Sequence, residues 1–138
     1  MKVTVPGLGD VKPWAPLDPT LYGLYVDEAK VVNSRSGRQM LQLNMHVTEG
    51  PTQMNGSEPE GRRIVDFIML DMAGSKPESV EFLQRKVDRA LESFGVEKDG
   101  NDFEPDDFVG KTASATIKTT LDQDGEQRDT VNKYRPEE

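Results

Sequence analysis

The residues from 41 to 48 alternate strictly between apolar and polar side chains. The apolar positions are Leu41, Leu43, Met45 and Val47, and the polar positions are Gln42, Asn44, His46 and Thr48. A period of two predicts a strand with one buried face and one hydrated face. Arg35 and Arg38 flank the turn that leads into this strand. A sheet face of amides, an imidazole and a hydroxyl, edged by guanidinium groups, suits an extended polyanion.

Further cations and aromatic rings fall where the same sheet would present them. The additional cations are Arg62, Arg63, Lys118, Arg128 and Lys133. The rings that we expect to stack on a flat ligand are first Tyr25 and Tyr134, then Trp14 and Phe67. His46 can donate a hydrogen bond or stack, while Trp14 can equally anchor one end of the core. Each residue alone is more often a solvated charge or a core ring, so the prediction rests on their collection around one sheet.

Groups that could perform catalysis or bind a metal are sparse in the sequence. The chain has one His and no Cys, and it has no phosphate-binding glycine-rich loop and no nucleophile elbow. Asp99, Asp102 and Asp106 miss the spacing of a calcium-binding EF-hand loop. We therefore expect no enzymatic activity, no catalytic residues, no metal site and no cofactor.

Length and composition favour a single domain of 138 residues. The absence of cysteine excludes disulfides and thiolate metal sites and is typical of a reducing compartment. No apolar run approaches the ~20 residues of a membrane span, so we expect a cytoplasmic protein without membrane association. The net charge is −8, and much of the acidic excess lies in one stretch: Glu97, Asp99, Asp102, Glu104, Asp106 and Asp107. The sheet can therefore still carry a local basic groove.

The order of the predicted elements indicates the fold class. Residues 1–20 are rich in proline and predict an extended N-terminal arm, followed by a folded domain over 21–136. Strands are predicted over 22–32, 41–48, 62–70, 112–121 and 126–134, with one helix over 77–94 that ends at Gly95. The first strand changes parity, so a bulge is expected near Asp27 and Glu28. This order predicts a mainly β fold, a five-stranded OB-fold barrel with its helix between the third and fourth strands.

Six short segments also resemble, in order, a bacteriophage family of small single-stranded DNA-binding proteins. These segments are YGLYV (22–26), SRSGRQML (34–41), GRRI (61–64), ALESFG (90–95), DFVGK (107–111) and VNKYRP (131–136). The resemblance implies an OB-fold that binds single-stranded DNA, without sequence preference, during phage DNA replication or recombination in the host cytoplasm. The acidic tail through which many such proteins recruit partners is reduced here to Glu137 and Glu138.

The sequence leaves a second function open. An OB barrel can instead dock a replication enzyme or join a phage assembly without binding nucleic acid directly, and the acidic stretch and the net charge favour that interpretation. Possible partners are therefore single-stranded DNA and phage or host replication proteins. The oligomeric state, monomer or dimer, also stays open.

Overall fold

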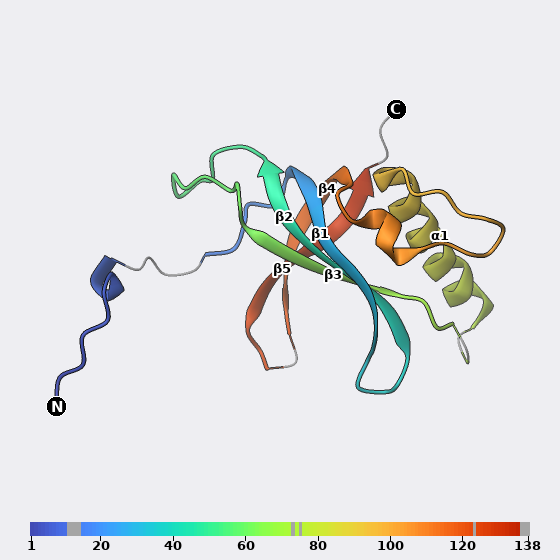
Figure 1. The fold of residues 1–138 in the computed structure, drawn as a ribbon, viewed down its shortest axis with the longest axis horizontal. Coiled ribbons are helices and arrows are strands. Elements are labelled where there is room, and N and C mark those ends of the chain that lie inside the picture. The colour runs from blue at the N-terminus through green and yellow to red at the C-terminus, as the bar shows by residue number, and fades with distance from the viewer. Residues whose placement is uncertain (11–14, 73, 75, 123, 136–138) are drawn as a thin grey trace.

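The computed structural model describes residues 1–10, 15–72, 74, 76–122 and 124–135. Its strands are β1 (Leu21–Asn33), β2 (Gln39–Glu49), β3 (Arg63–Met69), β4 (Thr112–Leu121) and β5 (Gln127–Arg135). The helix α1 (Pro77–Phe94) lies between β3 and β4, and two 3-10 turns, η1 (Leu8–Asp10) and η2 (Pro105–Phe108), complete the elements. The predicted fold class, mainly β with one helix between the third and fourth strands, is confirmed (Figure 1).

The five strands form one sheet in the order β3-β2-β1-β4-β5, and every neighbouring pair is antiparallel. The long strand β1 pairs with β2 along most of its length and with β4 from Leu21 to Tyr25. The register of β1 against β2 shifts between Val26 and Glu28, which is where the change of parity predicts a bulge. A bulge bends the strand, so β1 can serve both sides of a strongly curved sheet.

The two edge strands, β3 and β5, contact each other and almost close the sheet into a barrel. Among the described residues, no backbone ladder joins them. We call the boundary between these two edge strands the β3–β5 seam. Two side-chain contacts cross it. Arg62, just before β3, pairs with Asp129 of β5 at 2.8 Å. Further along the same two strands, the Tyr134 hydroxyl donates to Asp66 Oδ2 at 2.7 Å.

One face of α1 packs against β3, β4 and β5 at one end of the barrel. Pro77 occupies the first turn, as expected, and Gly95 ends the helix with a left-handed φ of 69°. Ala90, Leu91 and Phe94 are the buried apolar residues of this helix. The Phe94 ring makes edge contacts with Tyr134 at 5.3 Å and with Phe108 at 5.6 Å. The helix therefore covers the apolar interior next to the seam.

The N-terminal segment has two different parts. Residues 1–10 extend away from the barrel, and the side chains of Val3, Val5 and Leu8 are exposed (Figure 1). Leu17 also falls within the predicted arm, yet it is buried in the core at 3% exposure. The final part of the segment is thus fixed to the domain. Among the described residues, no helix is long and apolar enough to cross a membrane.

Asp66 is a carboxylic acid in the barrel interior, with 4% of its surface exposed. Burial raises its pKa, and the hydrogen bond from Tyr134 and the positive charge of Lys86 oppose that shift. Burial also holds the pKa of Tyr134 well above its usual value, so the phenol remains the hydrogen-bond donor. The pair is satisfied within the core, but the charged form of Asp66 carries a desolvation cost.

This raised pKa predicts how stability depends on pH. Because folded Asp66 binds its proton more tightly than unfolded Asp66, its contribution is fully present below the unfolded pKa and is lost as pH rises through the folded pKa. Asp66→Asn cannot titrate but keeps an oxygen that accepts from Tyr134. We expect wild type to lose stability relative to Asp66→Asn as pH rises above about 4, the ordinary pKa of an aspartate, by at most ~1.4 kcal/mol per pH unit.

Chemical denaturation of wild type and Asp66→Asn at several pH values measures the difference between their unfolding free energies directly. A difference in unfolding free energy that stays constant as pH rises above about 4 would contradict the raised pKa.

Candidate functional site

A cleft of about 1050 Å³ lies between the outer face of β2–β3 and the β4–β5 hairpin. In Figure 1 the β1–β2 and β4–β5 hairpins project from the same side of the barrel. The cleft is lined by Gln42, Arg63, Val65, Phe67, Thr120, Asp122, Glu126, Gln127, Arg128, Asp129 and Thr130. It runs along the outside of the β3–β5 seam.

The floor of the cleft is the outward face of β3. Ile64, Asp66 and Ile68 point into the core, so the alternate residues Arg63, Val65 and Phe67 face outward. Phe67 is 48% exposed and Val65 is 38% exposed. Phe67 lies opposite Gln42 of β2 in the ladder. An accessible aromatic ring beside the Gln42 amide and the exposed guanidinium of Arg63 can bind a flat, partly polar ligand.

The opposite wall is the β4–β5 hairpin. It carries the hydroxyls of Thr120 and Thr130, the amide of Gln127 and the partly neutralised guanidinium of Arg128. Arg128 donates from Nε to Asp122 at 2.9 Å, and its Nη2 lies 3.6 Å from Glu126. The hydrogen bond from Arg128 is the main reason that the pKa of Asp122 is lowered. Asp122 also accepts from the backbone N–H groups of Asp124 and Glu126, which fixes the hairpin turn. A ligand anion at Arg128 must therefore compete with these carboxylates.

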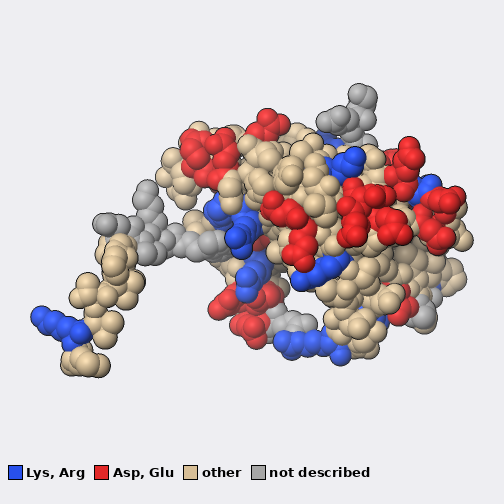
Figure 2. Space-filling view, viewed as in Figure 1, with Lys and Arg blue, Asp and Glu red and all other residues tan. Residues whose placement is uncertain are grey.

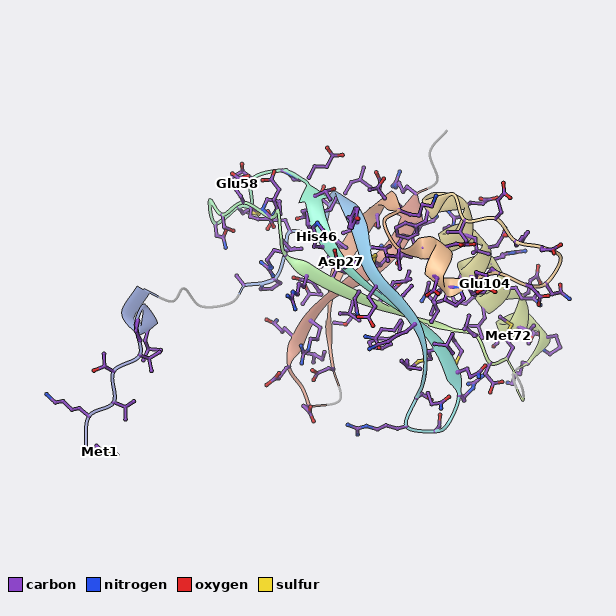
Figure 3. The ribbon with its side chains drawn as sticks, viewed as in Figure 1. Met1, Asp27, His46, Glu58, Met72 and Glu104 are labelled. Carbon is purple, nitrogen blue, oxygen red and sulfur yellow. The ribbon has the colours of Figure 1, made fainter. Side chains whose placement is uncertain are left out.

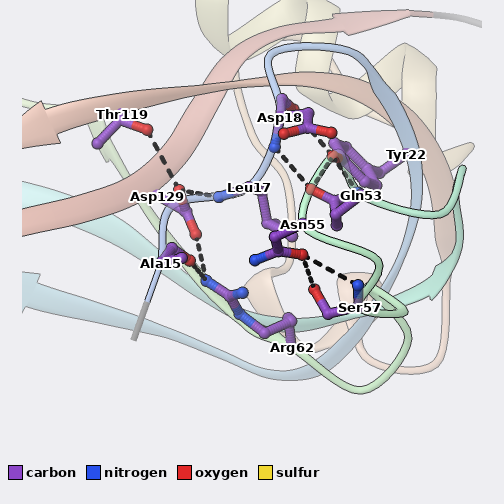
Figure 4. Close-up of polar contacts among 10 residues, drawn as sticks. All are labelled: Ala15, Leu17, Asp18, Tyr22, Gln53, Asn55, Ser57, Arg62, Thr119 and Asp129. Carbon is purple, nitrogen blue, oxygen red and sulfur yellow. Dashed lines mark hydrogen bonds and ion pairs between the residues drawn. The ribbon is translucent and has the colours of Figure 1, made fainter. Parts of the chain in front are cut away.

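Arg62 belongs to the framework behind the cleft, contrary to its predicted ligand-binding role. Its Nη2 donates to Asp129 at 2.8 Å and to the carbonyl of Ala15 at 2.9 Å (Figure 4). Asp129 also accepts from the backbone N–H of Leu17 at 3.1 Å, and its side chain is only 4% exposed. Arg62 and Asp129 thus tie the end of the N-terminal segment to both edge strands.

The remaining predicted cations differ in how available they are. Arg38 donates to the backbone carbonyl of Asp71 at 2.6 Å and is half-buried, so it does not project freely beside Arg35 as expected. Arg35 is exposed at the tip of the β1–β2 turn. Lys118 and Lys133 are exposed on β4 and β5, outside the lining of the cleft. Arg63 and Arg128 are the predicted cations that the structure brings into the cleft.

Tyr25 and His46 occupy the outer face next to the cleft. Their rings are tilted at 39° with centroids 5.2 Å apart. His46 Nδ1 lies 2.8 Å from the Asp27 carboxylate, and the two side chains lie together in Figure 3. His46 also lies opposite Arg63 in the β2–β3 ladder. Tyr25 and His46, two of the predicted binding residues, therefore lie next to the cleft floor, although neither lines the cleft itself.

Tyr134 does not occupy the position that we expected. It is 3% exposed, its hydroxyl is bonded to Asp66, and its ring contacts Phe94, so it has no accessible face for a ligand. The physical reason is a register shift between Thr116 and Ile117 in the β4–β5 pairing, which changes which residues of β5 face inward. Trp14 lies outside the described residues.

Phe67 is a predicted stacking residue that lies in the cleft, whereas the sequence analysis does not single out Val65, Thr120, Gln127 or Thr130. The predicted third strand is apolar on both parities, so its alternation does not show which face is buried. Asp66 would by itself favour the opposite orientation, because a carboxylate is ordinarily exposed and this one is buried against a distant partner, Tyr134. With Asp66 facing inward, Val65 and Phe67 must face outward.

Charge is unevenly distributed over the surface. In the view of Figure 2, Lys and Arg side chains gather over the middle of the molecule, and Asp and Glu side chains gather over the side that carries α1. The cleft itself mixes both signs, since Arg63 and Arg128 face Asp122, Glu126 and Asp129. Among the described residues, no group of His, Asp and Glu side chains is arranged to hold a metal ion.

Comparison with known proteins gives no functional assignment. No protein-family model matches the sequence, and no curated protein matches it significantly.

Proposed function

We propose that this protein binds single-stranded DNA without sequence preference in the cleft between β2–β3 and the β4–β5 hairpin. One observation carries the proposal: Phe67 is exposed on the cleft floor, beside Val65 and Arg63, on the outer face of β3. OB-folds bind oligonucleotides on the face of their second and third strands, between the loops that join strands one to two and four to five. The cleft lies against β2, β3 and the β4–β5 hairpin, which supports the same mode of binding here.

The chemistry of the cleft suits an unpaired strand. A base stacked on Phe67 would contribute ~1–3 kcal/mol, and such stacking tolerates any sequence because every base has a π-face. Gln42, Thr120 and Thr130 offer an amide and two hydroxyls that can bond to bases or sugars. Bases in a duplex are stacked on one another, so their faces are not accessible to the ring. The cleft should therefore favour single strands.

Electrostatics should contribute less than in a strongly basic groove. Asp129 is neutralised by Arg62, and Arg128 is already paired with Asp122 and Glu126. Arg63 in the cleft and Arg35 on the neighbouring turn are the best candidates for phosphate contacts, with Arg128 available by exchange. We thus expect few phosphate contacts and a correspondingly modest dependence on salt.

The sequence resemblance supports the biological setting of the proposal. It favours a phage protein that acts on DNA intermediates of replication or recombination in the host cytoplasm. In this role the protein holds DNA and catalyses no reaction, so the proposal requires neither a cofactor nor a metal.

A second candidate is an OB-fold module that docks another protein. The mixed charge of the cleft and the net charge of −8 favour it. Binding to a single-stranded homopolymer such as oligo-dT distinguishes the two candidates, because only the first requires it.

The first prediction concerns salt. With about three phosphate contacts and ~0.7 per contact for single strands, the slope of log K against log salt should be about −2. Fluorescence anisotropy with labelled oligo-dT between about 50 and 200 mM salt measures it. Absence of binding at the lowest salt would favour the protein-docking candidate, and a slope near zero would show that phosphates are not held.

The second prediction concerns the ring on the cleft floor. Phe67→Ala should weaken oligo-dT binding roughly 5- to 150-fold, because it removes a stacking surface worth ~1–3 kcal/mol. Phe82 provides the matched control, since it is an exposed phenylalanine at 66% on α1, away from the cleft. Phe82→Ala should bind like wild type. Equal affinities for the two variants would show that Phe67 does not contact the DNA.

The third prediction concerns the phosphate contacts. Arg35→Ala combined with Arg63→Ala should make the salt slope shallower by about 1 to 1.4, because two contacts of ~0.7 each are removed. Thermal stability should change little, as both side chains are exposed. Arg89→Ala, at an exposed position on α1, controls for the loss of positive charge. A double variant with the wild-type slope would place the phosphates elsewhere.

A further inference from the structure

The β3–β5 seam is held together differently from the neighbouring strand pairs of the sheet, which are joined by backbone hydrogen bonds. The described parts of β3 and β5 are in contact but share no backbone ladder. The polar contacts that cross the seam are made by the side chains of Arg62 with Asp129 and of Asp66 with Tyr134. The position of the β4–β5 hairpin relative to β3 therefore depends on side chains as well as on core packing.

These contacts lie directly behind the proposed binding surface. Arg62 and Asp66 are chain neighbours of Arg63, Val65 and Phe67, which form the cleft floor. Asp129 is flanked by Arg128 and Thr130, which line the opposite wall together with Asp129 itself. A shift of one wall along or away from the seam would separate groups that have to reach the same strand of DNA.

Both contacts are shielded well enough to hold a defined geometry. Asp66 is 4% exposed and Tyr134 is 3% exposed, and the Asp129 side chain is 4% exposed. Removing one partner would leave a buried polar group without its hydrogen bond, which is more costly than losing an exposed pair. A variant that removes one contact should thus relax the seam until the remaining partner is solvated.

We propose that Arg62, Asp129, Asp66 and Tyr134 are positioning residues for the ligand. They hold the two walls of the cleft at the spacing at which one nucleic-acid strand contacts both. This inference rests on the proposed function, and it assigns a role to Arg62 and Tyr134 that differs from direct contact with DNA. It also makes the affinity for DNA depend on residues that the DNA does not touch.

Two nearly isosteric variants test the proposal. Tyr134→Phe removes only the hydroxyl bonded to Asp66, and Asp129→Asn removes the charge paired with Arg62. Each should weaken oligo-dT binding about tenfold, at a temperature where circular dichroism shows full folding. Arg62→Lys, which keeps a cation beside Asp129, should retain more affinity than Arg62→Ala.

Val26→Ala is the control for a general loss of stability. Val26 is fully buried in β1, belongs to neither of the two seam contacts and does not line the cleft. This variant should melt at a lower temperature but bind oligo-dT within about twofold of wild type when folded. If the seam variants also bind within twofold, or if Val26→Ala loses as much affinity as they do, the positioning role is wrong.

A second measurement does not depend on DNA. The chain contains no cysteine, so spin labels can be attached uniquely at Ser36→Cys and Asp124→Cys, two exposed residues in the hairpin turns on either side of the cleft. Pulsed electron resonance should give one narrow distance distribution for wild type and Val26→Ala, and a broader or shifted one for Tyr134→Phe and Asp129→Asn. Unchanged distributions in the seam variants would overturn the proposal.

The two experiments separate the possible failures. Absence of oligo-dT binding by the wild-type protein would refute the proposed function, and the label distances would then decide alone whether the seam contacts set the spacing of the hairpins. Normal wild-type binding with unaffected seam variants would leave the proposed function intact and refute the positioning role.

Discussion

The structure depends on how the two edges of its sheet meet. Backbone hydrogen bonds hold the ladder from β3 through β2, β1 and β4 to β5, but among the described residues none joins β3 to β5. Two pairs of polar side chains cross this β3–β5 seam: Arg62 bonds to Asp129, and Tyr134 bonds to Asp66 further along the same strands. Polar groups buried in this way are stable only when they are paired, so each contact favours one arrangement of the two edges.

The cleft is a consequence of the same arrangement. When Asp66 faces Tyr134 inside the barrel, Val65 and Phe67 are directed outward, because successive side chains of a strand alternate between its faces. The hairpin of β4 and β5 then forms the second wall of the cleft. The Phe67 ring is thereby left exposed on the cleft floor, where the proposed ligand would stack on it.

Much of the fold follows from local sequence patterns. The period-two alternation of β2, the bulge in β1 and the end of α1 at Gly95 each depend on residues close together in the chain. The site depends more on distant pairs. Arg62 looks like a ligand-binding cation until Asp129, 67 residues further along the chain, is placed beside it. No local pattern in one sequence indicates such pairs, and the bulge that turns Tyr134 inward leaves no clear signal either.

The central claim is that a single strand of DNA lies in the cleft along the seam. An NMR titration of isotope-labelled protein with oligo-dT tests it most directly, because every backbone amide reports separately. We expect the changes in chemical shift to concentrate in residues 63–67 of β3 and 127–130 of β5, with smaller changes at the β1–β2 turn. Changes confined to α1 and the acidic loop 97–107, or no changes at all, would contradict it.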